Sequence, residues 1–252
     1  MNAVDLGILF PAFIAGLLVL ATHIPFGIKV LERGVIFADL AVAQIAGLGV
    51  VIAALLNLAD QPVMVQAIAA TSALFGAALL AWIETRLADV KEACIGLTFV
   101  LAASGGILLM SRDAHSGEHL QDLLVGQILW VSTNQLIATA LLTVVLLALW
   151  MGTKLKTANL GFYGLFALAV TASVQLVGVY LVFASLIVPA LATNRVKKWR
   201  VVHASLIGTS GYALGLLLSA WFDLPSGAAV VWAMAAIGII AAWLLNLRNA
   251  AG

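Results

Sequence analysis

The feature that most constrains this chain is a series of long apolar runs that follow one another from end to end. Seven are clear, at approximately 4–22, 35–57, 62–83, 92–110, 133–151, 203–222 and 226–247. Because an α-helix rises about 1.5 Å per residue, roughly 20 apolar residues cross the roughly 30 Å hydrocarbon layer of a bilayer. Hydrophobic residues make up 64% of the 252 residues and charged residues only 9%, against about 25% charged residues in soluble proteins. The sequence therefore predicts an all-α polytopic membrane protein with one transmembrane domain over residues 1–252.

An eighth apolar stretch, residues 161–192, is too long for one straight crossing. As a single helix it would extend about 48 Å. Basic residues stand on both sides of it, with Lys154 and Lys156 before it and four cations at 195–200 after it. Since Lys and Arg favour the cytoplasmic side, both basic loops should lie on that side, which requires two crossings between them. We therefore expect two short spans that meet near Val177 and Gly178. The prediction is a bundle of 8–9 transmembrane helices with a short broken helical hairpin at 161–192, the alternative being one tilted helix and eight crossings.

With nine crossings, the loops sort by charge. Eleven of the twelve Lys and Arg residues then lie on one side, and Arg112 alone lies opposite. This charge distribution predicts an external N-terminus and a cytoplasmic C-terminus. We also expect the first apolar run to be retained, because residues 1–5 lack the basic start of a cleaved signal peptide. A single cysteine, Cys94, excludes an internal disulfide framework, and a net charge of +1 gives no reason to expect a nucleic-acid partner.

Asp39 is the exceptional ionisable residue within the spans. A carboxylate in hydrocarbon costs about 2.5–3.5 kcal/mol on insertion scales, so Asp39 should face a polar interior. Two interpretations stay open, a transport-pathway group or a hydrogen bond near the end of its span. Gln44 is five residues further on, about 140° around a helix axis, so one helix cannot present both side chains on the same face.

A polar loop at 112–119 contains two imidazoles and two carboxylates. His115, Glu118 and His119 could form a low-affinity entry site for a divalent cation. The alternative is ordinary solvated polarity in an external loop. We expect no permanently bound cofactor, although a transported divalent metal is possible.

Four segments resemble the permease subunits of metal-ion ABC transporters, the type that takes up zinc, manganese and iron. The similar segments are Leu31–Gly34 leading to Asp39, Val177–Val182, Ser185–Ala190 and Asp223–Gly227. The resemblance implies a membrane-spanning permease of an ABC importer in a bacterial inner membrane, working by alternating access. It also implies three partners besides lipid, namely a cytoplasmic ABC ATPase, an extracytoplasmic solute-binding protein and a second permease copy in a homodimer.

The chain departs from this family at the pathway and at the ATPase contact. Asp39 and Gln44 are the pathway candidates, but the family places His four residues after the Asp, where this chain has Ala43. The expected ATPase-coupling loop keeps some family residues but lacks the acidic ones that normally precede them, so the basic segment after 192 is a second candidate. The coupling candidates are Lys156, Ala158, Leu160, Gly161, Arg195, Lys197 and Lys198.

The chain has no G-x-x-x-x-G-K-[ST] motif. We therefore expect it to be a transport subunit and not an enzyme, with ATP hydrolysis in a separate chain. The alternatives are a gradient-driven secondary transporter or channel without an ATPase, and an ABC permease for a substrate other than a metal. Scarcity of ionisable groups within the spans weighs against ion-coupled transport.

Overall fold

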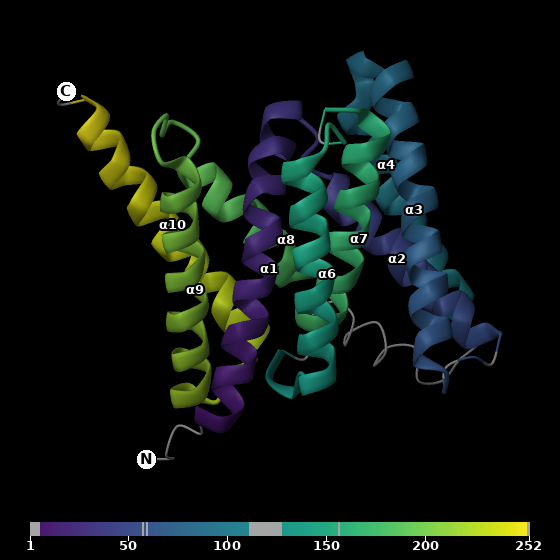
Figure 1. Ribbon diagram of the computed structural model, residues 1–252, viewed down its shortest axis with the longest axis horizontal. Coiled ribbons are helices and arrows are strands. Elements are labelled where there is room, and N and C mark those ends of the chain that lie inside the picture. Colours follow the sequence, from purple (N-terminus) through teal and green to yellow (C-terminus); the bar gives the residue numbers. More distant parts are fainter. Residues whose placement is uncertain (1–5, 57, 59, 111–127, 156, 251–252) are drawn as a thin grey trace. The chain divides into compact units, whose positions relative to one another are not determined.

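The structure is a computed structural model that describes residues 6–56, 58, 60–110, 128–155 and 157–250 (Figure 1). Within these ranges the chain is helical and contains no strand. Short 3-10 turns at Ala88–Val90 and Ile128–Trp130 precede two of the helices. The helices are α1 (Leu6–Arg33), α2 (Ala38–Leu55), α3 (Pro62–Arg86), α4 (Lys91–Met110), α6 (Thr133–Gly152), α7 (Asn159–Val177), α8 (Val179–Ala192), α9 (Arg200–Phe222) and α10 (Ser226–Ala250).

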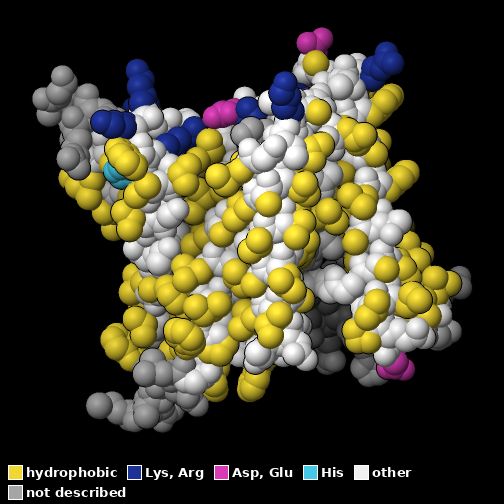
Figure 2. All heavy atoms as spheres, viewed as in Figure 1, with side chains coloured by type: hydrophobic (Ala, Val, Ile, Leu, Met, Phe, Trp, Pro, Cys, Tyr) yellow, Lys and Arg dark blue, Asp and Glu magenta, His cyan; other side chains and the backbone are white. Residues whose placement is uncertain are grey.

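Eight helices in the described ranges are long and apolar enough to cross a membrane. Large apolar side chains on them point outward; Phe75, Leu108 and Trp232 are each more than 70% exposed. Figure 2 shows hydrophobic side chains along the helices on the visible face, with Lys and Arg at helix ends. Because a soluble monomer rarely exposes so much apolar surface, these faces are suited to lipid. The predicted helical membrane bundle is confirmed.

The break predicted in 161–192 is confirmed at Gly178. This residue separates α7 from α8 and has φ 81° and ψ 162°, in a region that side chains with a Cβ rarely adopt. The two helices have 19 and 14 residues. At about 1.5 Å per residue, α8 is about 21 Å long, which is shorter than the bilayer core. The ninth apolar helix therefore exists but is too short for an ordinary full crossing.

The first helix is longer than the apolar pattern predicted. It was expected to end near residue 22 but continues for 28 residues to Arg33, with Pro25 inside it. The residues beyond Pro25 stay buried, including Phe26 and Val30, so packing holds the helix together across the proline. Such prolines are tolerated in membrane helices because neighbouring groups satisfy the freed carbonyl. The helix ends at Arg33, and Gly34, which follows it, has φ 64°.

Contacts divide the chain into two compact units. Unit 1 comprises 1–33, 124–143 and 175–252, and it contains α1, α8, α9, α10, the start of α6 and the end of α7. Here α9 and α10 lie side by side, and α1 packs on α8 and α9 (Figure 1). Small residues allow this close packing: a Cβ on Gly211 would lie 2.7 Å from Met234 Cβ, and Gly215 lies against Val230. The GxxxG pair of α9 therefore packs on α10, inside the unit.

Unit 2 comprises 34–123 and 144–174. In it α2 packs on both α3 and α4. A Cβ on Gly49 of α2 would lie 2.6 Å from Ser72 Oγ, and one on Gly76 of α3 would lie 2.7 Å from Ile45 Cδ1. These glycines set the close approach of α2 to α3, as small residues do in membrane helix pairs. The prediction of a single domain over 1–252 stays a prediction.

Candidate functional site

The strongest candidate group is Asp39, in the first turn of α2. Its side chain is fully buried. In the described part of the chain neither carboxylate oxygen has a hydrogen-bond partner. At the N-terminus of α2 a different carboxylate accepts a backbone hydrogen bond: the Phe37 amide donates to Glu92 Oε1 of α4 at 3.2 Å. Among the described residues, Asp39 thus does not form the hydrogen bond near the end of its span that was the second interpretation of this residue.

Helix geometry places Asp39 on a face of α2 that is turned away from α4. At 100° per residue, Asp39 lies about 180° from Leu48, whose Cδ1 lies 4.0 Å from a Cβ built on Gly105 of α4. Ala43 and Ala46, four and seven residues after Asp39, share its side of the helix and are buried. The carboxylate therefore stands on a buried apolar face that also includes Val42, three residues after it.

Gln44 does not join this face. It lies about 40° from Leu48 and about 140° from Asp39, and its side chain is half-buried. Ala43, one helical turn after Asp39, has no atom that could bind a cation. The helix α2 therefore does not offer a pair of cation ligands on one side. Any further ligand to a cation at Asp39 must come from another helix or another molecule.

A second buried polar group lies in unit 1. His23 lies within α1 and is fully buried. Its Nδ1 is 3.0 Å from both the Val19 carbonyl oxygen and Thr22 Oγ1, while its Nε2 has no partner in the described part of the chain. His23 belongs to unit 1 and Asp39 to unit 2.

Two further polar contacts have partners that are distant in sequence. Ser185 Oγ of α8 donates to the Leu181 carbonyl at 2.7 Å and lies 2.9 Å from the Tyr212 hydroxyl of α9. Glu92, which receives the Phe37 amide, was not identified from the sequence either. No local pattern marks such residues, because their partners are 27 and 55 positions away.

The metal candidates of the 112–119 loop cannot be placed. His115, Glu118 and His119 lie outside the described residues. Within the ranges that are described, no three His, Cys, Asp or Glu side chains form a group suited to a metal ion. Of the metal candidates from the sequence, Asp39 is the one that lies among the described residues.

The predicted ATPase-coupling loop connects α6 to α7. Ala158 and Leu160 are exposed, the latter to 63%, and Lys156 lies outside the described residues. A Cβ on Gly161 would lie 2.6 Å from the Leu155 carbonyl oxygen, so the loop requires a glycine there to fold back on α7. The exposed apolar side chain of Leu160 is available to a partner.

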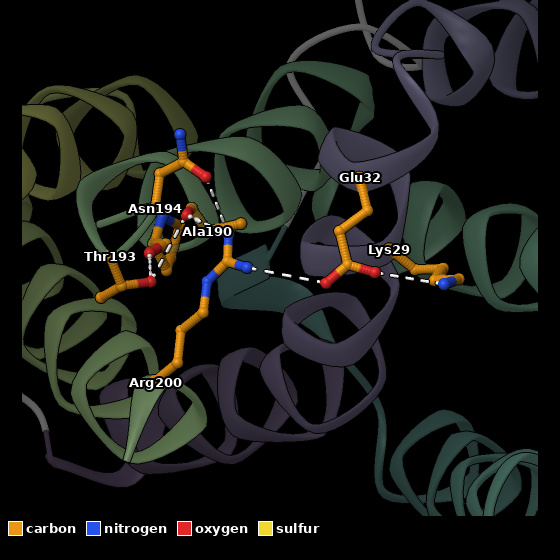
Figure 3. Close-up of polar contacts among 7 residues, drawn as sticks. Lys29, Glu32, Ala190, Thr193, Asn194 and Arg200 are labelled. Carbon is orange, nitrogen blue, oxygen red and sulfur yellow. Dashed lines mark hydrogen bonds and ion pairs between the residues drawn. The ribbon is translucent and has the colours of Figure 1, made fainter. Parts of the chain in front are cut away.

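The second coupling candidate connects α8 to α9. Figure 3 shows Arg200, the first residue of α9, pointing toward Glu32 and the end of α8. Arg195, Lys197 and Lys198 are exposed. Four basic residues lie close together here in the sequence. In the structure the Arg200 side chain contacts other residues of the protein, whereas the other three are exposed.

Comparison with known proteins gives a family and a fold. The sequence profile of the ABC 3 transport family matches residues 5–152 and 147–245. A solved structure, PsaBC from Streptococcus pneumoniae in complex with Fab, is similar with a TM-score of 0.71 over 93% of this chain and 89% of that chain. Its sequence identity is 22%, so this likeness supports the fold alone.

Three curated relatives are similar in sequence. The probable iron transport system membrane protein of Haemophilus influenzae is 27% identical over 63% of this chain and 66% of its own length. The manganese transport system membrane protein MntC of Listeria monocytogenes is 28% identical over 69% of each chain. The chelated iron transport system membrane protein YfeD of Yersinia pestis is 28% identical over 68% of this chain and 64% of its own. The matches thus span about two thirds of the relatives' lengths.

Proposed function

Because the chain belongs to the ABC 3 transport family, we propose that it is the membrane-spanning permease subunit of an ABC importer for a divalent metal ion. The observation that carries the proposal is the family match over nearly the whole chain. The names of the similar proteins from Haemophilus, Listeria and Yersinia support a manganese or iron substrate, and zinc belongs to the same chemical class.

Asp39 is the proposed pathway group. A buried carboxylate without a partner is costly to keep in a membrane protein, and such groups mark ion pathways. A divalent cation passing Asp39 would supply the positive charge that the described residues do not. Because Ala43 offers no ligand, the cation would be held weakly on this helix and would keep water or gain ligands from elsewhere, for example Gln44 of another copy. Weak binding suits a group that must release its cargo.

The energy is proposed to come from a separate cytoplasmic ATPase pair. ATP-driven closure of these subunits would switch a homodimer of this chain between outward and inward access, and an extracytoplasmic binding protein would deliver the ion. Of the two coupling candidates, the α6–α7 connection is favoured, because it keeps Ala158, Leu160 and Gly161 of the loop that the family resemblance implies. The orientation proposed is an external N-terminus and a cytoplasmic C-terminus in a bacterial inner membrane.

The test is metal uptake by cells that express the chain together with its ATPase. Asp39→Asn removes the charge at nearly constant volume and should abolish uptake of manganese, iron or zinc while the complex still assembles. Gln44→Asn, on the other side of α2, tests the second pathway candidate separately. Normal uptake by Asp39→Asn would remove Asp39 from the mechanism.

Reconstitution separates the alternatives. Purified chain and ATPase in proteoliposomes should require ATP for metal accumulation. Transport by the chain alone, driven by an ion gradient, would identify a secondary transporter or channel instead. An ATPase complex that leaves the cellular content of all three metals unchanged would identify an ABC permease for another substrate.

A further inference from the structure

The connection between α8 and α9, residues 193–199, has a defined shape. Thr193 Oγ1 donates to the Pro189 carbonyl at 2.8 Å, which closes the end of α8. The Asn194 amide donates to the Leu191 carbonyl at 3.0 Å, and the Val196 amide donates to the Thr193 carbonyl at 3.0 Å. These bonds turn the chain directly after α8. The side chains that follow are therefore presented from an ordered turn.

The Arg200 side chain stabilises this turn through hydrogen bonds to the end of α8 and to the turn itself. Its Nη2 donates to the Ala190 carbonyl at 3.3 Å and to Asn194 Oδ1 at 3.4 Å, and its Nη1 lies 3.7 Å from Glu32 Oε1 (Figure 3). Glu32 Oε2 also accepts from Lys29 Nζ at 3.1 Å. The acidic group beside the turn is thus already shared by two cations, and it cannot neutralise the remaining basic residues.

Three cations of the turn face outward. Arg195, Lys197 and Lys198 are exposed, and none of them has a hydrogen bond or ion pair from its side chain to any residue that the structure describes. Three positive charges within four positions repel one another unless an anion lies between them. The turn therefore presents an uncompensated positive surface.

Large apolar side chains surround these charges. Trp199 is 66% exposed and has φ 64°, a left-handed conformation that turns the chain into α9. Val201 and Val202 in the first turn of α9 are about half exposed, and Leu191 near the end of α8 is 58% exposed. Since α9 is a candidate membrane span, the turn lies where a span ends. Tryptophan is enriched at that depth, where the headgroups meet the acyl chains.

We propose that Arg195, Lys197, Lys198 and Trp199 form a binding site for an anionic phospholipid. The cations would hold the headgroup phosphate, while Trp199 and Val202 would lie against the first part of an acyl chain. Juxtamembrane cations attract anionic lipid, and the exposed apolar surface favours a ligand with a tail over a free phosphate ion. The proposal does not depend on the transported substrate or on the ATPase.

The test is lipid binding to the purified full chain in detergent, measured by native mass spectrometry. The probes are phosphatidylglycerol and phosphatidylcholine with identical short acyl chains. The unaltered protein should prefer phosphatidylglycerol. Lys197→Gln/Lys198→Gln should weaken phosphatidylglycerol binding roughly 25-fold, at about fivefold for each cation, and weaken phosphatidylcholine binding less, because the choline group of that lipid already offsets its phosphate charge. Arg86→Gln/Lys154→Gln, which removes two exposed cations at other helix ends, should change the affinity at most a few-fold.

A second variant tests the apolar half of the site. Trp199→Gly keeps a residue that accepts φ 64°, so the turn should survive, and binding of both lipids should weaken. Equal affinity for the two lipids, or no effect of the Lys197 and Lys198 changes, would overturn the proposal. It would also be overturned if soluble glycerol phosphate competed as well as phosphatidylglycerol.

Discussion

The Ser185 hydroxyl of α8 lies 2.9 Å from the Tyr212 hydroxyl of α9, and both side chains are fully buried. Ser185 also donates to the Leu181 carbonyl one turn earlier on its own helix. The Tyr212 ring reaches Gly16 of α1, where a Cβ would overlap it. One hydrogen bond and one glycine thus join three helices of unit 1.

This arrangement predicts unequal effects of two conservative substitutions. Ser185→Ala leaves the buried Tyr212 hydroxyl without a partner and should destabilise the protein by about 1–3 kcal/mol. Tyr212→Phe should cost less, about 0.5–1.5 kcal/mol, because Ser185 keeps its bond to Leu181. Denaturation of the full chain in detergent, with the double variant completing the cycle, measures both. Equal costs would show that Tyr212 has another partner.

The second prediction concerns the stability of Asp39 variants. A buried carboxyl group without partners opposes folding, so Asp39→Asn should leave the thermal midpoint unchanged or raise it. The expected loss of uptake would then be separate from any loss of stability. The measurement is thermal unfolding in detergent without added metal. A fall of several degrees would reveal a stabilising partner of the carboxylate.

The third prediction restores the imidazole that the family resemblance implies. Ala43→His places a side chain one turn after Asp39, and the two could share a cation. Ala43 is buried, so the larger residue should itself cost about 1–3 kcal/mol. Added manganese or zinc should raise the thermal midpoint of Ala43→His more than that of the unaltered protein. The same metals should have no such effect on Asp39→Asn/Ala43→His; a similar rise there would place the metal elsewhere.

The fourth prediction compares two glycines in helices. A Cβ on Gly211 would lie 2.7 Å from Met234 Cβ, whereas a Cβ on Gly164 would meet nothing within 4 Å. Gly211→Ala should therefore destabilise the α9–α10 contact by about 1–3 kcal/mol. Gly164→Ala should be neutral or stabilising by up to about 1 kcal/mol, because alanine loses less backbone entropy. Thermal unfolding of the two variants side by side tests this, and an equal loss would contradict the packing assigned to α9.

The sequence by itself determined the class of this protein and the place of its main helix break. Apolar runs of membrane length require helices in lipid, since the backbone must satisfy its own hydrogen bonds there. The basic residues on both sides of 161–192 indicated two spans in that stretch, and Gly178 supplies the conformation that the break needs. These properties depend on residues that are close together in the chain.

Tertiary structure decided which face of each helix is covered, and by what. Packing continues α1 beyond Pro25 and places the GxxxG pair of α9 against α10. The first amide of the α2 end donates to Glu92, and Asp39 has no hydrogen-bond partner among the residues that the structure describes. Tertiary structure also directed Arg200 toward Glu32, leaving the rest of its basic cluster exposed. Helical periodicity shows which residues share a face, but the neighbour on that face comes from a distant part of the chain, so only packing can identify it.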